Sequence, residues 1–250
     1  MLKKRGERPV LCVEYDATFD GFLSALFEAF LRRGEQVVFS RGEGGTPPLM
    51  PAVRASADDA RARRLLSGMD RLSKDLKKTV YRAWLSGQQG IDDDILGCLR
   101  TGFEKNLSPL EMRYIPCCAR VINAAHAVGL EQQRFLQFVR FKRAGEDFFV
   151  ADIEPLYDIL PLIGDHFHKR YLNQRFVIRD LSRLRGLLSD QTGWEIIALE
   201  PRMCAPVLEG SAEALWRAYF QAIANPARKN TKLQQKFIPL RYRRYLTEFE

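Results

Sequence analysis

The feature that most constrains the fold is an amphipathic segment from Phe19 to Leu31, which follows a short apolar run. Its apolar residues recur at the spacing i, i+3, i+4, i+7: Phe19, Phe22, Leu23, Leu26, Phe27, Phe30 and Leu31. This spacing places all of them on one face of a helix. The run Val10–Tyr15 before the helix predicts a strand, and Val37–Phe39, after Gly34, predicts a second one. The chain is therefore expected to open with a strand, a helix and another strand.

The next segment predicts a loop and then helices. Residues 40–51 are rich in Gly and Pro and predict the loop. Helices are expected over Ser56–Leu66, Asp70–Leu85 and Asp92–Phe103, with Ser56 and Asp92 as N-caps and Gly87 ending the second. The acidic run Asp92–Asp94 resembles a metal site. Acidic residues at a helix start also complement the helix dipole, and we prefer that interpretation.

Ser108–Glu111 has the spacing of a capping box, with Pro109 at the first helical position. We place a domain boundary just before it. The prediction is a strand–helix segment with a helical region over residues 1–105, and a second domain over 106–250. The helix is reset at Pro116 and is expected to run to about Leu136.

The hydrophobic period changes at Phe138. Over residues 138–143 apolar and cationic side chains alternate, which is typical of a strand; 144–147 predict a turn and 148–153 a return strand. These segments predict an antiparallel hairpin, in a sheet with a strand near 176–178. Further strands are expected at 185–188 and 195–199, and helices at 156–172 and 211–224. The expected fold class is α+β, mainly helical, with a small antiparallel sheet covered by helices.

Composition excludes several classes of protein. With 46% hydrophobic residues the chain can close a core, yet no window approaches the roughly 18 apolar residues of a membrane span. The basic start is followed by an apolar run too short for a secretory signal, so a cytoplasmic address and no membrane partner are expected. The five cysteines lack the spacing of metal or disulfide motifs and are interpreted as reduced, mostly buried thiols.

The net charge of +8 is concentrated at the two ends of the chain. Residues 225–250 carry seven basic side chains against two acidic ones, and residues 1–8 carry four against one, which accounts for the whole excess. Clustered positive charge favours a polyanionic partner. The alternative is a pair of solvated tails.

The segment 230–245 interleaves cations with aromatic rings, an arrangement that can contact phosphates and stack on bases. Its aromatic residues could instead hold the tail on the core, and we expect both roles. The predicted nucleic-acid-binding residues are Arg140, Lys142, Arg170, Arg228, Lys229, Lys232, Lys236, Arg241, Tyr242, Arg243 and Arg244.

Candidate catalytic residues are Glu131, His166 and Asp180, which lie at or near the ends of predicted elements. Carboxylates at such positions, Asp152 included, can instead form ion pairs with neighbouring arginines. His166 and His168 are two apart on a predicted helix and point in divergent directions, so no metal site is predicted. No cofactor is predicted, because no phosphate-binding loop, nucleophile motif or iron–sulfur motif occurs.

Seven segments together carry a resemblance to a known family: residues 15–30, 131–141, 166–170, 177–180, 215–216, 232–242 and 246–248. They resemble a bacterial family described as "probable DNA metabolism protein", whose core is a domain of unknown function. The chain departs from the family pattern at Thr231, where proline is usual, and at Arg243, where an aromatic residue is common. The resemblance implies a role in DNA repair or modification beside a radical S-adenosylmethionine (SAM) protein. Related domains are also fused to uracil-DNA glycosylase domains.

We therefore expect a DNA-binding accessory protein that acts with a radical SAM partner and has no chemistry of its own without it. One alternative is an enzyme acting on nucleic acid through Glu131, His166 and Asp180, which would have to converge in one cleft. The other is a protein-interaction adaptor whose basic tail meets an acidic partner surface.

Overall fold

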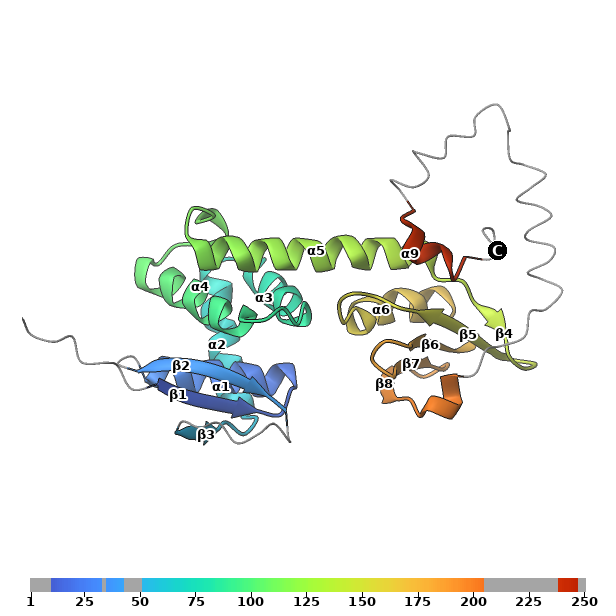
Figure 1. Cartoon of the computed structure of the whole chain (residues 1–250), viewed down its shortest axis with the longest axis horizontal. Coiled ribbons are helices and arrows are strands. Elements are labelled where there is room, and N and C mark those ends of the chain that lie inside the picture. The colour runs from blue at the N-terminus through green and yellow to red at the C-terminus, as the bar shows by residue number, and fades with distance from the viewer. Residues whose placement is uncertain (1–9, 33–34, 43–50, 205–237, 247–250) are drawn as a thin grey trace, which may run out of the picture. The chain divides into compact units, whose positions relative to one another are not determined.

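The computed structural model describes residues 10–32, 35–42, 51–204 and 238–246 (Figure 1). The chain forms two compact units, Met1–Gly129 and Leu130–Glu250, which divide within one long helix. The domain boundary expected after residue 105 stays a prediction. The helix expected over 211–224 lies outside the described residues.

The sheet of the first unit is parallel. Its strands are β1 (Val10–Tyr15), β2 (Gln36–Arg41) and β3 (Ala52–Arg54), in the order β2-β1-β3. The strands β1 and β2 and the helix between them were predicted. The short strand β3 follows the loop expected over residues 40–51 and was missed, because three residues with a single large apolar side chain give no detectable period.

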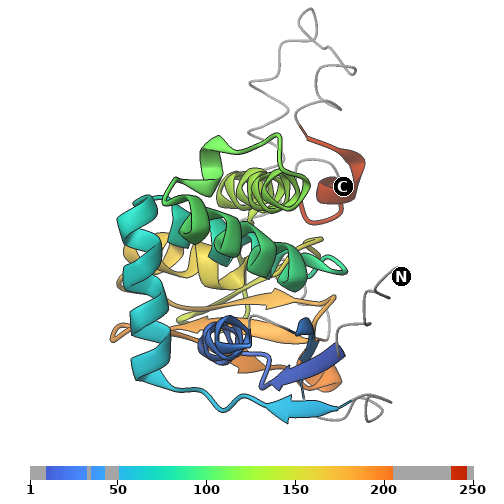
Figure 2. The same cartoon turned by 90° about the vertical axis from the view of Figure 1, so that its left-hand side faces the viewer.

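The helices of the first unit are α1 (Phe19–Leu31), α2 (Asp59–Leu72), α3 (Leu76–Leu85) and α4 (Ile91–Lys105). Thr18 caps α1 by accepting a hydrogen bond from the Gly21 amide at 3.0 Å. The predicted cap Ser56 is wrong: Asp58 caps α2 by accepting from the amides of Ala60 and Arg61. Figure 2 shows α1 nearly end-on, with α2 rising beside it from the level of β3 to that of α4.

Two further helix-start predictions are corrected. Asp92 is not the cap of α4, because Gly90 holds that position in the left-handed conformation, with φ of 77°. Ser108 makes no side-chain cap bond, and only a short 3-10 helix, Pro109–Glu111, follows it. The long helix α5 (Pro116–Phe138) begins instead at the proline expected to reset it.

The sheet of the second unit has five strands. They are β4 (Lys142–Arg143), β5 (Phe148–Ile153), β6 (Arg175–Asp180), β7 (Arg185–Ser189) and β8 (Trp194–Ala198), hydrogen-bonded in that order. The predicted hairpin is confirmed in β4 and β5, but its first strand is shorter than expected because α5 continues to Phe138. The pair β5–β6 is parallel, because a helical crossover connects the two strands.

That crossover contains α6 (Leu160–Arg170), which lies along one face of the sheet (Figure 1). Gly164 on α6 is required by close packing, since a Cβ there would lie 2.6 Å from the Trp194 ring. Trp194 in turn donates a hydrogen bond to Asp165 at 2.8 Å. A short 3-10 helix, Pro201–Cys204, follows β8, and α9 (Leu240–Arg243) lies beside the end of α5. The expected α+β class is confirmed, with a parallel sheet and a mixed one.

No helix within the described ranges is long and apolar enough to cross a bilayer.

Candidate nucleic-acid interface

An aromatic cluster closes one end of the second unit. Phe141, in the link between α5 and β4, contacts three rings with centroids 5.2–5.7 Å away. They belong to Phe167 of α6, Tyr171 at the C-cap of that helix, and Phe176 of β6. We call these four residues the Phe141 cluster. Edge-to-face packing of this kind fixes the relative positions of the segments that contribute the rings. The cluster therefore joins the end of α5 to the end of α6.

Three predicted nucleic-acid-binding residues adjoin the rings of this cluster. Arg140 and Lys142 flank Phe141 in the chain, and the guanidinium of Arg170 lies 5.8 Å from the centroid of the Tyr171 ring. Arg140 also donates to the carbonyl of Gln137 at 2.7 Å, which caps the end of α5. We define the basic rim as Arg140, Lys142, Lys169, Arg170 and Arg175. Of these, Lys169, Arg170 and Arg175 are exposed.

The basic tail contacts the second unit through α9. Tyr242 is 4% exposed, and its ring packs against Phe135 and Phe138 of α5 at 5.2 and 5.9 Å. Its hydroxyl donates to Oε1 of Glu131 at 3.2 Å. The ring is thus occupied by protein contacts and offers no free face to a base. Tyr242 is an anchor of the tail rather than a stacking residue.

The described cations of the tail have protein partners. Arg244 is exposed, forms an ion pair with Glu154 at 3.3 Å and lies over the Tyr245 ring. Arg243 donates to the carbonyl of Ile238 at 3.3 Å. Burial and the Glu154 carboxylate raise the pKa of Tyr245 well above its usual range. The remaining predicted cations lie outside the residues whose side chains are described: Arg228, Lys229, Lys232, Lys236 and Arg241.

Glu131, a candidate catalytic residue, binds the loop that follows β5. It is 2% exposed, and its carboxylate accepts hydrogen bonds from the amides of Leu156 and Tyr157 at 3.1 and 2.8 Å. With the Tyr242 hydroxyl, three donors surround the two oxygens. A buried carboxylate is stable only when paired in this way. Glu131 therefore connects the loop after β5 to α9.

Asp180, the second candidate, holds the same loop from its other side. It is fully buried, accepts from the Ser182 and Arg183 amides at 3.0 and 3.2 Å, and pairs with the Arg183 guanidinium at 3.0 Å. Arg183 also donates to the carbonyls of Pro155 and Leu156. Burial raises the pKa of Asp180, and the hydrogen bonds and charge of Arg183 oppose that shift. Glu131 binds amides of the loop, and Arg183, which is paired with Asp180, binds its carbonyls.

His166, the third candidate, lies apart from this arrangement. It is exposed on α6, with its ring 5.1 Å from that of Phe167. His168 points elsewhere and shares a 3.0 Å hydrogen bond with Ser189 of β7. Within the described part of the chain, no group of three or more His, Cys, Asp and Glu side chains is placed to hold a metal ion. The three candidate catalytic residues therefore do not share a common contact.

A buried polar network in the first unit was not foreseen. Tyr15 and Arg41 are the last residues of β1 and β2 and lie opposite each other in the sheet. Both donate hydrogen bonds to Asp92 of α4, at 2.7 and 3.0 Å. Trp84 donates to the Tyr15 hydroxyl at 3.2 Å. The one sequence signal for this contact is that both predicted strands end in polar residues, since the carboxyl ends of parallel strands lie at the same edge of a sheet.

The other acidic and thiol groups of the first unit also have structural surroundings. Asp94 pairs with Arg120, while burial and the adjacent Asp92 and Asp94 carboxylates raise the pKa of Asp93 to about 6. Cys12, Cys98 and Cys118 are buried, as expected, and burial raises the pKa of each thiol.

Residues 89–248 match the family described as "Domain of unknown function (DUF4130)", and the chain belongs to that family. The matched residues include the Phe141 cluster, the basic rim, Glu131, Asp180 and α9. None of the curated proteins searched matched the chain.

One solved structure similar to the chain is a pGpG-specific phosphodiesterase, PggH, from Vibrio cholerae. The two are 10% identical, with a TM-score of 0.36, over 72% of this chain and 81% of that one.

Proposed function

We propose that this protein binds DNA through the basic rim of its second unit and serves as an accessory protein in DNA repair or modification. The observation that carries the proposal is the Phe141 cluster, which joins two chain segments that each supply cations to the rim. Fixed guanidinium and ammonium groups bind phosphates without regard to base sequence.

Charge pairing in the second unit supports this assignment. Two of its acids are already engaged, since Asp152 pairs with Arg179 at 2.6 Å and Asp180 pairs with Arg183. Lys169 and Arg170 are exposed and form no ion pair within the described residues. Their charge is therefore available to an external polyanion.

The tail extends the same surface in this proposal. The docking of Tyr242 at Glu131 holds α9 against α5. The cations that precede α9 in the chain then become further phosphate contacts. The partner enzyme is a radical SAM protein, as the family resemblance implies, and the reaction chemistry belongs to that partner. Pull-down of the native protein should recover such a partner together with DNA, and recovery of neither would contradict this part of the proposal.

The alternatives differ in their requirements. An enzyme needs Glu131, His166 and Asp180 at one reacting centre, whereas Glu131 and Asp180 are saturated by structural bonds and His166 lies apart from them. An adaptor needs an acidic protein partner and no affinity for DNA. The geometry favours the DNA-binding proposal over the enzyme, and a binding measurement separates it from the adaptor.

The test is fluorescence anisotropy of the full chain with a labelled 20-nucleotide strand and the matching duplex at several salt concentrations. Each phosphate contact contributes about 0.7–0.9 to the slope of log affinity against log salt. Lys169→Gln/Arg170→Gln should reduce that slope by about 1.4–1.8. The control Lys74→Gln/Lys78→Gln removes two exposed cations of the first unit and should leave the slope unchanged. Absence of binding, or equal slopes for all three proteins, would overturn the proposal.

A further inference from the structure

A groove in the first unit has no role in the function proposed above. Three helices form it: Phe27 and Phe30 come from α1, four residues from α2, and three from α4. Its volume is about 670 Å³, within the roughly 300–1,000 Å³ typical of small-molecule sites. The lining includes Arg64 and Arg71 of α2 and Arg100 and Phe103 of α4.

The floor of the groove is aromatic. The Phe30 and Phe103 rings meet edge to face at 5.5 Å. The Arg64 and Arg61 guanidinium groups lie over the Phe27 ring, at 5.7 and 5.9 Å from its centroid. Gly68 of α2 lets the Phe103 ring pack close to that helix, since a Cβ there would lie 3.1 Å from the ring. The groove thus offers flat apolar surfaces to a ring system.

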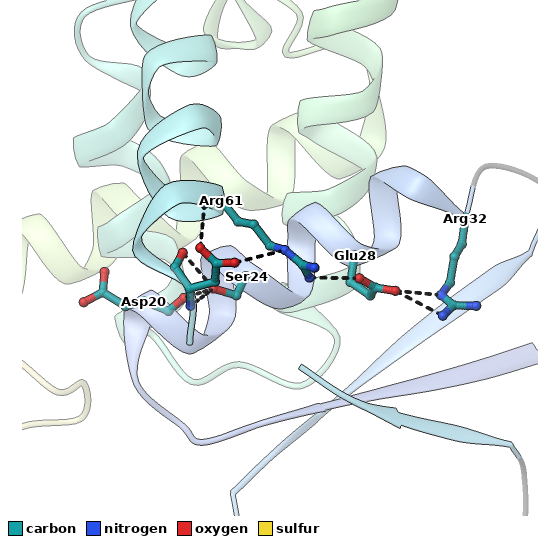
Figure 3. Close-up of polar contacts among 6 residues, drawn as sticks. Asp20, Ser24, Glu28, Arg32 and Arg61 are labelled. Carbon is teal, nitrogen blue, oxygen red and sulfur yellow. Dashed lines mark hydrogen bonds and ion pairs between the residues drawn. The ribbon is translucent and has the colours of Figure 1, made fainter. Parts of the chain in front are cut away.

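The wall is cationic, and the neighbouring acids do not neutralise it. Glu28 lies between Arg61 and Arg32, which bind its two oxygens at 3.2 and 3.0 Å (Figure 3). Asp58 is paired with Arg61 as well. The carboxylates along the α1–α2 contact are therefore used by other arginines.

Arg64 and Arg71 carry no ion pair within the described residues. They are two helical turns apart and both exposed. Arg100 donates to the carbonyl of Ala29 at 2.8 Å and adds its charge at the end of α1. Glu104 is the acidic residue of the lining, so three guanidinium groups face one carboxylate.

We propose that this groove binds a nucleotide, with Arg64 and Arg71 on its phosphate and the base against Phe30 and Phe103. Guanidinium groups bind phosphate oxygens with charge-assisted hydrogen bonds, and aromatic rings accept any base. The choice of a nucleotide over another phosphorylated aromatic group rests on the proposed function. The nucleotide is either free or part of a single strand.

The experiment titrates the full chain, by isothermal calorimetry, with orthophosphate, dAMP, an eight-residue oligo-dA and a phosphotyrosine peptide. The dAMP should bind at least about tenfold more tightly than orthophosphate, because the base adds contacts. A strand that binds more tightly still than dAMP assigns the site to single-stranded DNA, and equal affinities assign it to the free nucleotide. Either result supports the proposal.

Arg64→Gln/Arg71→Gln should weaken dAMP binding about tenfold or more, since two charged contacts are lost. The control Arg63→Gln/Lys78→Gln removes two exposed cations outside the lining and should change it less than about twofold. Arg100 is left intact because it supports α1. Circular dichroism checks that both variants remain folded.

The proposal is overturned if dAMP does not bind, if orthophosphate binds equally well, if the peptide binds more tightly, or if Arg64→Gln/Arg71→Gln binds like the control. The rim variant Lys169→Gln/Arg170→Gln should retain dAMP binding. Loss of duplex binding in that variant alone concerns the second unit, so failure of one proposal is distinguishable from failure of the other.

Discussion

The hydrogen bond between Tyr242 and Glu131 allows the stability of the contact between tail and loop to be predicted quantitatively. Tyr242→Phe keeps the ring against Phe135 and Phe138 and removes only the hydroxyl that donates to Glu131 at 3.2 Å. Both residues are less than 5% exposed, so water does not replace the lost bond. A hydrogen bond to a charged group contributes about 1.5–3 kcal/mol, and this one is long, so about 1–2 kcal/mol is expected.

The Leu156 and Tyr157 amides report this loss directly, because both donate to the same carboxylate. Their hydrogen exchange, followed by NMR, should accelerate about 5- to 30-fold in Tyr242→Phe, since 1.4 kcal/mol corresponds to a factor of ten. The control is Tyr114→Phe, a residue that is 75% exposed, and it should leave both rates unchanged. Unchanged rates in Tyr242→Phe would refute the coupling between tail and loop.

Three other predictions follow. The pKa of Asp93 is raised to about 6 in the folded state, so the native protein keeps the carboxyl proton to a higher pH than the unfolded chain does. The resulting stabilisation of the folded state is full below about pH 4 and is lost as the pH rises through 6. Asp93→Asn should therefore melt above wild type by a margin that grows from pH 4 to 7. The margin should be small because solvent also reaches this side chain and screens its charge, and a constant margin would contradict the prediction. Gly164→Ala forces a methyl group against the Trp194 ring and should destabilise the protein by about 1–3 kcal/mol in urea unfolding. The control Gly129→Ala meets only the flexible end of the Arg82 side chain and should cost little stability. Equal effects would argue against close packing of α6. Purified protein should release no product from uracil-containing, single-stranded or duplex DNA, with or without divalent metal, and product that vanished in Asp180→Asn would make the chain an enzyme.

Local patterns predicted the elements well where a single period extended over a whole element. The strand β1 and helix α1 have the bounds expected from Val10–Tyr15 and Phe19–Leu31. Elements that depend on tertiary contacts were misplaced. The strand β3 exists because β1 offers it an edge to pair with, and Asp58 rather than Ser56 caps α2 because the Asp58 amide binds Ser24 of α1 at 2.9 Å.

The candidate site, like the fold, could be predicted from the sequence only in part. Sequence reasoning selected Glu131 and Asp180 as acids near the ends of elements. In the structure Glu131 binds the loop after β5 directly, and Asp180 binds Arg183, which contacts the same loop. Their roles could not be predicted, since the partners Tyr242 and Arg183 come from other parts of the fold or from a turn. Residue type alone does not distinguish a catalytic carboxylate from one that holds a loop.

The most direct test of the central claim is hydrogen–deuterium exchange of the full chain with and without a 20-nucleotide strand at low salt. Binding through the basic rim predicts slower exchange in peptides covering residues 139–143 and 168–176, and reversal of that protection as salt is raised. Unchanged exchange in both segments, under conditions where the strand is bound, would contradict the claim.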